Sequence, residues 1–336
     1  MKVLTFAYPE DPHTPHLGVL KDNTVVDLAV ARSWAQEERS LPVEFLPDSV
    51  FELMQAGPVA WRYAGNLVNV LEGIDPLYVK GVDRKPVGRR LHGVQLHPPL
   101  PRPMSVRDFY AFEQHVAAAR AIRGKEMLPE WYQFPAFYFS NPNAIFGTDE
   151  TIPYPGYSQA LDYELEVACI IGRAGINIRA TEAEAYIFGY TIFNDWSARD
   201  VQQLEMRVGL GPAKSKDFAS SLGPWIVTPD EIAKHSAGRP GVYNLNMTAR
   251  VNGEDRSHGN WSTIHYSFGE MIARASDGVY LLPGDVLGSG TVGSGCLLEL
   301  TRGQGPWLKP GDQVELEIEG LGVLSNQVGD QARIGR

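Results

Sequence analysis

Cysteine and long apolar runs are scarce in this sequence. Its 336 residues include two cysteines, Cys169 and Cys296, which lie in separate segments without a metal-binding or redox spacing. We expect both to be buried free thiols, and we assign them neither a disulfide nor a catalytic role. There is no apolar run of about 18 residues, and residues 1–6 lead directly into a strand pattern. The sequence therefore predicts no membrane span, no signal peptide and a cytoplasmic location.

Basic clusters and phosphate-binding loops are also missing. The 30 Lys and Arg residues are outnumbered by 40 Asp and Glu residues, which gives a formal net charge of −10. Since nucleic acids and anionic membranes are themselves negatively charged, we expect neither as a partner. The glycine-rich residues 288–295 lack the GKS/T ending of a phosphate loop and do not form a G-x-G-x-x-G pattern before a helix, so nucleotide binding is not predicted. Their glycines instead permit a ligand to approach the backbone closely.

The chain divides at a proline-rich stretch. Its hydrophobic content of 43% is enough for a sizeable core. Residues 1–97 predict a small β-rich module, with strands near 3–8, 17–20 and 24–28 and a helical stretch at 49–55. Residues 96–103 hold four prolines, which break any regular element, so we place a linker at 98–104. Residues 105–336 then form a second, strand-rich domain.

The most unusual stretch is an acidic strand pattern at 161–171. Asp162, Glu164 and Glu166 alternate with apolar residues, which places all three on one face of a strand. Neighbours on that face lie about 6 to 7 Å apart along the strand. A carboxylate pair at about 5 Å repels by on the order of 3 kcal/mol at an effective dielectric of 20. Such a row requires a cation, unless it is the solvated acidic face of an edge strand.

A second acid follows a nearby strand and favours the cation. Residues 181–187 predict a helix with Thr181 as N-cap and Glu184 completing a capping box. The β-branched and aromatic run that follows ends at Asn194, which delivers Asp195 to the tip of a strand. Carboxylates with no Cys or His nearby are the ligand set of Mg²⁺, Ca²⁺ or Mn²⁺, and not of zinc. The sequence therefore predicts a divalent-cation site.

Other polar residues allow two interpretations from sequence alone. His115 begins an Ala-rich helical pattern, where a structural histidine is commoner, although histidine is also the side chain best suited to proton transfer near neutral pH. Arg123 precedes a glycine hinge at Gly124, and Lys216 lies close to serines and an acid. Both cations fit either a ligand contact or a solvated surface.

Several motifs together resemble the fumarylacetoacetate hydrolase family over residues 105–330. The matching blocks are Asp108-Phe109-Tyr110 with His115, Arg123-Gly124-Lys125-Glu126, Leu161 to Glu166, Asn194 to Asp200 with Gln202-Gln203, Lys216 with Ser220, Gly290-Thr291, and Leu297 to Leu300. The resemblance implies an α+β, mostly β fold: a mixed β-roll catalytic domain with a small SH3-like N-terminal domain. This agrees with the strand count and the proposed linker.

The same resemblance implies roles for individual residues. The implied metal ligands are Asp108, Glu164, Glu166 and Asp195, holding Mg²⁺ or else Ca²⁺ or Mn²⁺. The implied catalytic residues are His115 as general base, Glu299 as the acid that orients it, and Lys216 as a donor to developing negative charge. The implied substrate contacts are Tyr110, Arg123, Gln202 and Thr291. Asp162 would then support a ligand or face solvent.

The implied activity is hydrolysis of a C–C bond in a β-diketo acid of the fumarylacetoacetate or acylpyruvate type, by a homodimer acting in aromatic amino acid catabolism. The chain is shorter than the animal enzymes of this kind, and Met206 stands where they have a substrate-contacting tyrosine. Alternatives are a 2-hydroxydienoate isomerase or hydratase, or a 2-oxo acid decarboxylase. A silent binding protein on the same fold would require His115 and Glu299 to lie apart.

Overall fold

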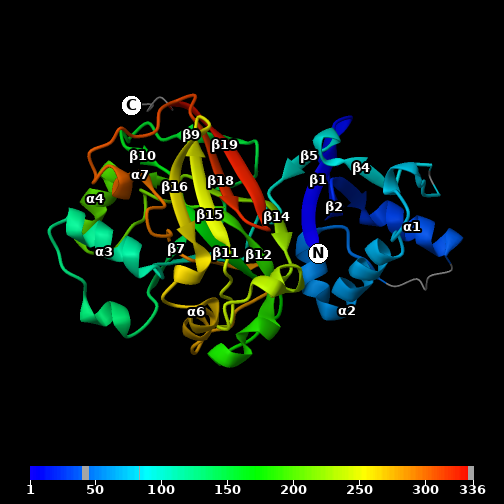
Figure 1. The fold of residues 1–336 in the computed structure, drawn as a ribbon, viewed down its shortest axis with the longest axis horizontal. Coiled ribbons are helices and arrows are strands. Elements are labelled where there is room, and N and C mark those ends of the chain that lie inside the picture. The colour runs from blue at the N-terminus through cyan, green and yellow to red at the C-terminus, as the bar shows by residue number, and fades with distance from the viewer. Residues whose placement is uncertain (40–44, 83, 332–336) are drawn as a thin grey trace.

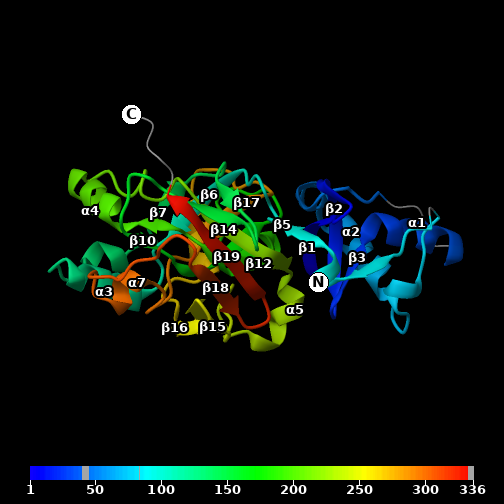
Figure 2. The same ribbon diagram turned by 90° about the horizontal axis from the view of Figure 1, so that it is seen from above.

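The computed structural model describes residues 1–39, 45–82 and 84–331. They form a mixed α+β fold that is mostly strand, as predicted. Figure 1 places the N-terminal elements at one side of a larger body, in which two sheets pack face to face. The view from above in Figure 2 separates the same two parts along the long axis.

The N-terminal part is built on a hairpin and two helices. Its elements are β1 (Lys2–Tyr8), β2 (Asp11–Lys21), β3 (Thr24–Asp27), α1 (Leu28–Glu38), α2 (Val50–Asn69), η1 (Pro76–Tyr78), β4 (Gly88–Arg90), η2 (Leu91–Gly93) and β5 (Gln95–His97). The three predicted strands are confirmed, while α1 was not predicted. Asp27 caps α1 through its side chain, and Ser49 caps α2, which extends past the predicted helical stretch across a kink at Gly57.

The larger sheet joins N-terminal strands to the strands that carry the acids. Its order is β4-β3-β2-β1-β14-β12-β11-β17-β6-β7, with β5 beside β1 and β8 beside β14. The bounds are β6 (Ser105–Phe109), β7 (Phe137–Ser140), β8 (Ile145–Phe146), β11 (Leu165–Ile171), β12 (Ile187–Asn194), β14 (Ser220–Val227) and β17 (Asp285–Gly288). Strands β11 and β12 are antiparallel, whereas β17 and β6 are parallel.

A second sheet covers one face of β11 and β12. Its order is β16-β15-β18-β19-β9, with bounds β9 (Thr151–Tyr154), β15 (Asn246–Val251), β16 (Glu254–Asn260), β18 (Gln313–Ile318) and β19 (Gly322–Gln331). Along β11, Val167 and Cys169 enter the core shared with this sheet, while Ala168 and Ile170 pack on the opposite side. Both faces of β11 are therefore buried, which excludes the solvated edge strand.

Short helices and strands surround these sheets. They are α3 (Glu113–Ile122), η3 (Pro129–Tyr132), β10 (Leu161–Asp162), η4 (Ala180–Tyr186), β13 (Ser197–Ala198), α4 (Arg199–Val208), α5 (Pro229–Ile232), η5 (Ala233–His235), η6 (Trp261–Thr263), α6 (Phe268–Ala275) and α7 (Leu297–Leu300). The predicted helix at 181–187 is the 3-10 segment η4, and its capping box is wrong. Glu184 instead accepts a hydrogen bond from the Gly241 backbone, and the capping box of this fold is Ser267 with Glu270 at α6.

The predicted linker at 98–104 is irregular, yet packing crosses it. Strand β1 pairs with β14 at Lys2 and Val3, and one apolar cluster contains N-terminal residues together with Ile170 and Phe188. The division at 98–104 and the SH3-like character of the N-terminal module stay predictions. Among the helices that the structure describes, none is long and apolar enough to cross a membrane.

Candidate metal and active site

Four of the predicted acids come from strand ends in the larger sheet. Asp108 lies in β6, Glu166 in β11, Glu164 just before β11, and Asp195 directly after β12. Their exposed fractions are 3%, 0%, 4% and 0%, so none is a solvated surface acid. Asp108 has room because its partner in the parallel register is Gly288, where an added Cβ would lie 2.4 Å from Asp108 Oδ1.

Asp108 and Glu166 form one half of the acid cluster. Oxygens of Asp108, Glu164 and Glu166 all lie within 4.8 Å of one another. The Gly290 backbone nitrogen donates to Glu166 at 2.9 Å and to Asp108 at 3.3 Å. Burial, and then repulsion from Asp195, raises the pKa of Asp108, while burial and the Asp108 charge raise the pKa of Glu166. In the metal-free protein, burial and mutual repulsion therefore favour the protonated form of these two acids.

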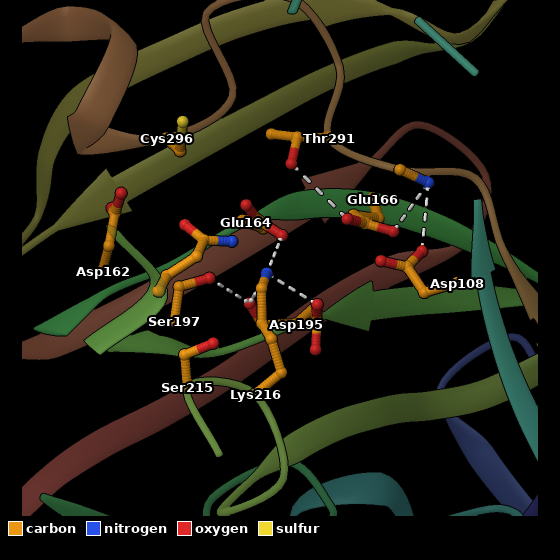
Figure 3. Close-up of polar contacts among 12 residues, drawn as sticks. Asp108, Asp162, Glu164, Glu166, Asp195, Ser197, Ser215, Lys216, Thr291 and Cys296 are labelled. Atoms are coloured by element: carbon orange, nitrogen blue, oxygen red, sulfur yellow. Dashed lines mark hydrogen bonds and ion pairs between the residues drawn. The ribbon is translucent and has the colours of Figure 1, made fainter. Parts of the chain in front are cut away.

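Glu164 and Asp195 form the other half around a buried lysine. In Figure 3 the ammonium of Lys216 lies between these two carboxylates. It is 2.7 Å from Asp195 Oδ2, which also accepts a hydrogen bond from Tyr138. Burial by itself would raise the pKa of Glu164, but Lys216 and Arg199 outweigh it and hold that pKa well below the usual range. Lys216 therefore forms ion pairs with two protein carboxylates, and its role as a donor to substrate stays a prediction.

Asp162 does not face solvent, and its strand is interrupted. The predicted single strand is two pieces, β10 and β11, separated at Tyr163 and Glu164. Asp162 is fully buried and accepts hydrogen bonds from Arg199 Nε at 2.8 Å and from the Leu297 and Leu298 nitrogens at 2.8 and 3.0 Å. Arg199 also reaches Glu164 Oε1 at 2.8 Å. Through Arg199, Asp162 therefore connects the candidate metal ligand Glu164 to the start of α7.

Replacing Asp162 by asparagine is expected to lower the free energy of unfolding by about 3 kcal/mol, because the buried Arg199 loses one of its two carboxylate partners and keeps only Glu164. Denaturant titration measures this loss. The matched control is Glu254→Gln, which breaks an exposed pair with Arg256 and should change stability by at most about 1 kcal/mol. Similar small losses in both variants would contradict the structural role of Asp162.

His115 and Glu299 meet beside the acid cluster. His115 lies in α3 and Glu299 in α7, and His115 Nδ1 is 2.5 Å from Glu299 Oε1. The other Glu299 oxygen accepts from the Ser294 backbone at 3.1 Å, which fixes the carboxylate. His115 is near enough to Glu164 to contribute to the lowering of that carboxyl's pKa, and the Tyr110 ring lies edge-on to His115 at 5.4 Å. The separation that would mark a silent fold is therefore not found.

The four predicted substrate contacts differ in their burial and in their distance from the acid cluster. Tyr110 lies beside His115, and burial raises its pKa to about 12, so it can donate a hydrogen bond. Thr291 is buried and its hydroxyl is 3.5 Å from Glu166. The Gln202 oxygen accepts from Arg199 at 3.0 Å. Arg123 is exposed at the end of α3, where its Nε donates to the Ala119 carbonyl, although its charge acts on Tyr110.

Three residues at the site were missed by sequence reasoning. Arg199 follows Asp195 by four positions and could have been found as the cation that the acids require. Tyr138, which donates to Asp195, has no local signal because the two residues lie on different strands. Cys296, taken as a thiol without a role, has its sulfur 3.7 Å from Glu299 Oε1.

The residues fit a divalent cation. The site contains five buried acids, which are Asp108, Glu164, Glu166, Asp195 and Asp162. Two cations, Lys216 and Arg199, form ion pairs with them among the described residues, so acids outnumber cations. Asp195 Oδ1 is buried without a hydrogen-bond partner among the described residues. Excess negative charge, a free oxygen and all-oxygen donors are the features that favour Mg²⁺, Mn²⁺ or Ca²⁺.

Comparisons with known proteins show which sequences and structures this chain is similar to. Fumarylacetoacetase of Arabidopsis thaliana is 29% identical over 369 residues, covering 91% of this chain and 87% of that protein. Oxaloacetate tautomerase YisK of Bacillus subtilis is 28% identical over 318 residues, covering 93% of this chain and 95% of that protein. The structure of a maleylpyruvate hydrolase from Sphingobium sp. SYK-6, in complex with manganese(II) and pyruvate, shares the fold with a TM-score of 0.65 at 20% identity, over 99% of this chain and 100% of that chain.

These relatives differ in reaction, so they establish a shared enzyme fold and not one activity. The family model described as fumarylacetoacetate hydrolase C-terminal matches residues 105–329, the part that holds every candidate site residue. The chain belongs to the fumarylacetoacetate hydrolase family.

Proposed function

We propose that the protein is a divalent-metal-dependent hydrolase that cleaves a C–C bond in a 2,4-dioxo acid of the acylpyruvate or fumarylacetoacetate type. The observation that carries this proposal is the contact of His115 with Glu299 beside the acid cluster. A general base must reach the water that it activates, and an acid that fixes the imidazole keeps it in one orientation.

The residues divide the work of hydrolysis as follows. His115 takes a proton from water, and the resulting hydroxide oxygen adds to the C4 carbonyl of the substrate. The C3–C4 bond then breaks, its electron pair passes to the enolate of the 2-oxo acid, and the proton returns to C3. Arg199 Nη2 is buried without a partner among the described residues, so it can donate to the negative charge that develops. We also propose the amide nitrogen of Gln202, whose oxygen accepts a hydrogen bond from Arg199, as a donor to this charge.

Asp108, Glu164, Glu166 and Asp195 would hold the cation, which when bound polarises the substrate oxygens and stabilises enolate charge. The family includes a structure with manganese(II) and pyruvate, and pyruvate is the acid that acylpyruvate cleavage would release. This supports Mn²⁺ or Mg²⁺ as the cation. We also propose Tyr110, which lies beside His115, and Thr291, whose hydroxyl is 3.5 Å from Glu166, as substrate contacts.

The test is a product analysis with a series of 2,4-dioxo acids in the presence of Mg²⁺ or Mn²⁺. The proposal predicts pyruvate and a second carboxylic acid in equal amounts, with the new carboxylate oxygen taken from water. Exchange of C3 hydrogen with solvent, without any carboxylic acid product, would contradict it.

A keto–enol tautomerase is the second candidate function, because YisK is named an oxaloacetate tautomerase and aligns over 93% of this chain. Tautomerisation needs a base at C3 but no attacking water. Spectroscopic enol decay of oxaloacetate, measured beside the product analysis, distinguishes the two reactions. The isomerase, hydratase and decarboxylase alternatives are distinguished by the same product analysis.

Arg123 is proposed to bind the far carboxylate of a dicarboxylate substrate. Gly124 follows it with a φ of 67°, a conformation that gives the segment a sharp turn after α3. Replacing Arg123 by lysine is expected to raise KM for a dicarboxylate substrate by about 10-fold, because a planar guanidinium grips a carboxylate with two hydrogen bonds. Steady-state kinetics with a neutral-tailed substrate is the control, and equal losses on both substrates would return Arg123 to a surface charge.

A homodimer, a cytoplasmic location and a place in aromatic amino acid catabolism are also proposed. The homodimer is proposed from the family resemblance, the cytoplasmic location from the sequence pattern, and the catabolic role from the substrate class. Sedimentation at several protein concentrations tests the dimer.

A further inference from the structure

A second cluster of ligand-type side chains lies next to the acid cluster. One ligand atom from each of His115, Cys296 and Glu299 lies within 4.8 Å of the other two. His115 is 4% exposed, Cys296 is fully buried, and the Glu299 side chain is 6% exposed. They come from three places, α3, the glycine-rich segment before α7, and α7 itself. The proposed hydrolysis uses the histidine and the glutamate but gives the thiol no task.

The two clusters differ in ligand chemistry. The first offers oxygens alone, which suits hard cations that retain water ligands. The second offers one imidazole, one sulfur and one carboxylate, and this mixture suits Zn²⁺ and other soft or borderline cations. Three protein ligands with a fourth position open is also the usual number in a zinc site that is not purely structural.

We propose that His115, Cys296 and Glu299 form a second metal site, selective for Zn²⁺ or a similar thiophilic cation, whose occupation blocks the His115–Glu299 pair. Binding releases the thiol proton of Cys296 to solvent and occupies His115 Nδ1, the nitrogen that faces Glu299. The ring proton is then held on Nε2, so this nitrogen cannot accept a proton from water. The metal site is inferred from the positions of these three side chains alone, whereas its inhibitory effect rests on the proposed function.

The spacing of the donors requires one small adjustment. A tetrahedral zinc ion with ordinary bond lengths separates its ligand atoms by about 3.3 to 3.7 Å. The Cys296 sulfur and Glu299 Oε1 are already 3.7 Å apart. His115 Nδ1 and Glu299 Oε1, at 2.5 Å, must separate by about 1 Å. The site therefore requires a side-chain rotation of Glu299, whose other oxygen accepts a hydrogen bond from the Ser294 nitrogen at 3.1 Å.

The test uses Cd²⁺ as a spectroscopic probe and Zn²⁺ as an inhibitor. Wild-type protein with saturating Mg²⁺ is titrated with Cd²⁺, and the ultraviolet thiolate-to-cadmium charge-transfer band is recorded. We expect one equivalent to produce the band, and Cys296→Ala to abolish it. The matched control is Cys169→Ala, which removes the other buried free thiol in the middle of β11 and should leave both the band and the basal activity unchanged.

The inhibition measurement separates this inference from the proposed function. Zn²⁺ should inhibit the wild-type protein reversibly in the presence of Mg²⁺, and Cys296→Ala should raise the inhibitory Zn²⁺ concentration by at least about 10-fold. A band without inhibition would support the metal site and contradict His115 as the hydrolytic base. No band in the wild-type protein, or an undiminished band in Cys296→Ala, would overturn the second metal site, whatever the catalytic outcome.

Discussion

Replacing His115 by alanine is expected to lower kcat for a 2,4-dioxo acid by at least about 100-fold, within the range for loss of a general base. The reason is geometric. The imidazole is held by a carboxylate that is itself fixed by the Ser294 backbone. Mn²⁺ affinity should hardly change, because the acid cluster retains all its oxygens. Steady-state kinetics and a Mn²⁺ titration measure the two quantities.

Two further variants make this prediction specific. Glu299→Gln should also lower kcat, and the double variant should be little worse than His115→Ala, because the pair acts as one unit. His13→Ala is the control, since His13 is an exposed histidine on β2. Additive losses in the double variant, or an unaltered rate for His115→Ala, would assign the base to another residue.

The second large effect is expected from two acids that lie in one cluster but in opposite electrostatic settings. Glu166 faces Asp108, whereas Glu164 is paired with Lys216 and Arg199. Glu166→Gln should therefore raise the stability of the metal-free protein by on the order of 1 to 3 kcal/mol, and Glu164→Gln should lower it by about 3 kcal/mol. Both should weaken Mn²⁺ binding by at least about 100-fold.

The electrostatic surroundings of Glu166 also determine how the free energy of unfolding changes with pH. Burial and Asp108 raise the pKa of Glu166 in the folded state, so above the ordinary carboxyl pKa of about 4.3 the folded protein holds more protons than the unfolded one. The free energy of unfolding of metal-free protein should therefore fall as pH rises toward that raised pKa, and Glu166→Gln should reduce the fall. Denaturation in the presence of a chelator, at several pH values, measures this. Equal stability changes in the two variants would show that the acids do not differ as described.

Local patterns predicted the parts of the site that local structure determines. The aromatic and β-branched run that ends at Asn194 is β12, and it delivers Asp195 to the strand end. The Ala-rich pattern around His115 is α3. In both cases side-chain periodicity is sufficient, because each residue is positioned by the element in which it lies.

Contacts between distant segments could not be predicted from such patterns. Strict alternation placed Asp162 with Glu164 and Glu166, but Asp162 turns to Arg199 and to the start of α7, which lies 135 residues away in sequence. Asp108 had no local signal, and only the family resemblance identified it, because its neighbours come through the parallel pairing of β6 with β17. The contact of Cys296 with Glu299 was missed for the same reason. Helix α1 is a different case, because its Asp27 N-cap and Ala-rich sequence are local signals that were overlooked.

A divalent cation in the carboxylate cluster is required for the proposed C–C cleavage. Pyruvate release from an acylpyruvate, measured after exhaustive chelation and again during stepwise addition of Mn²⁺, tests this requirement. We expect chelation to abolish pyruvate release, and activity to return in proportion to bound Mn²⁺ with its maximum near one ion per chain. Full activity in the chelated protein, or Mn²⁺ binding that restores no activity, would show that the cation is not required.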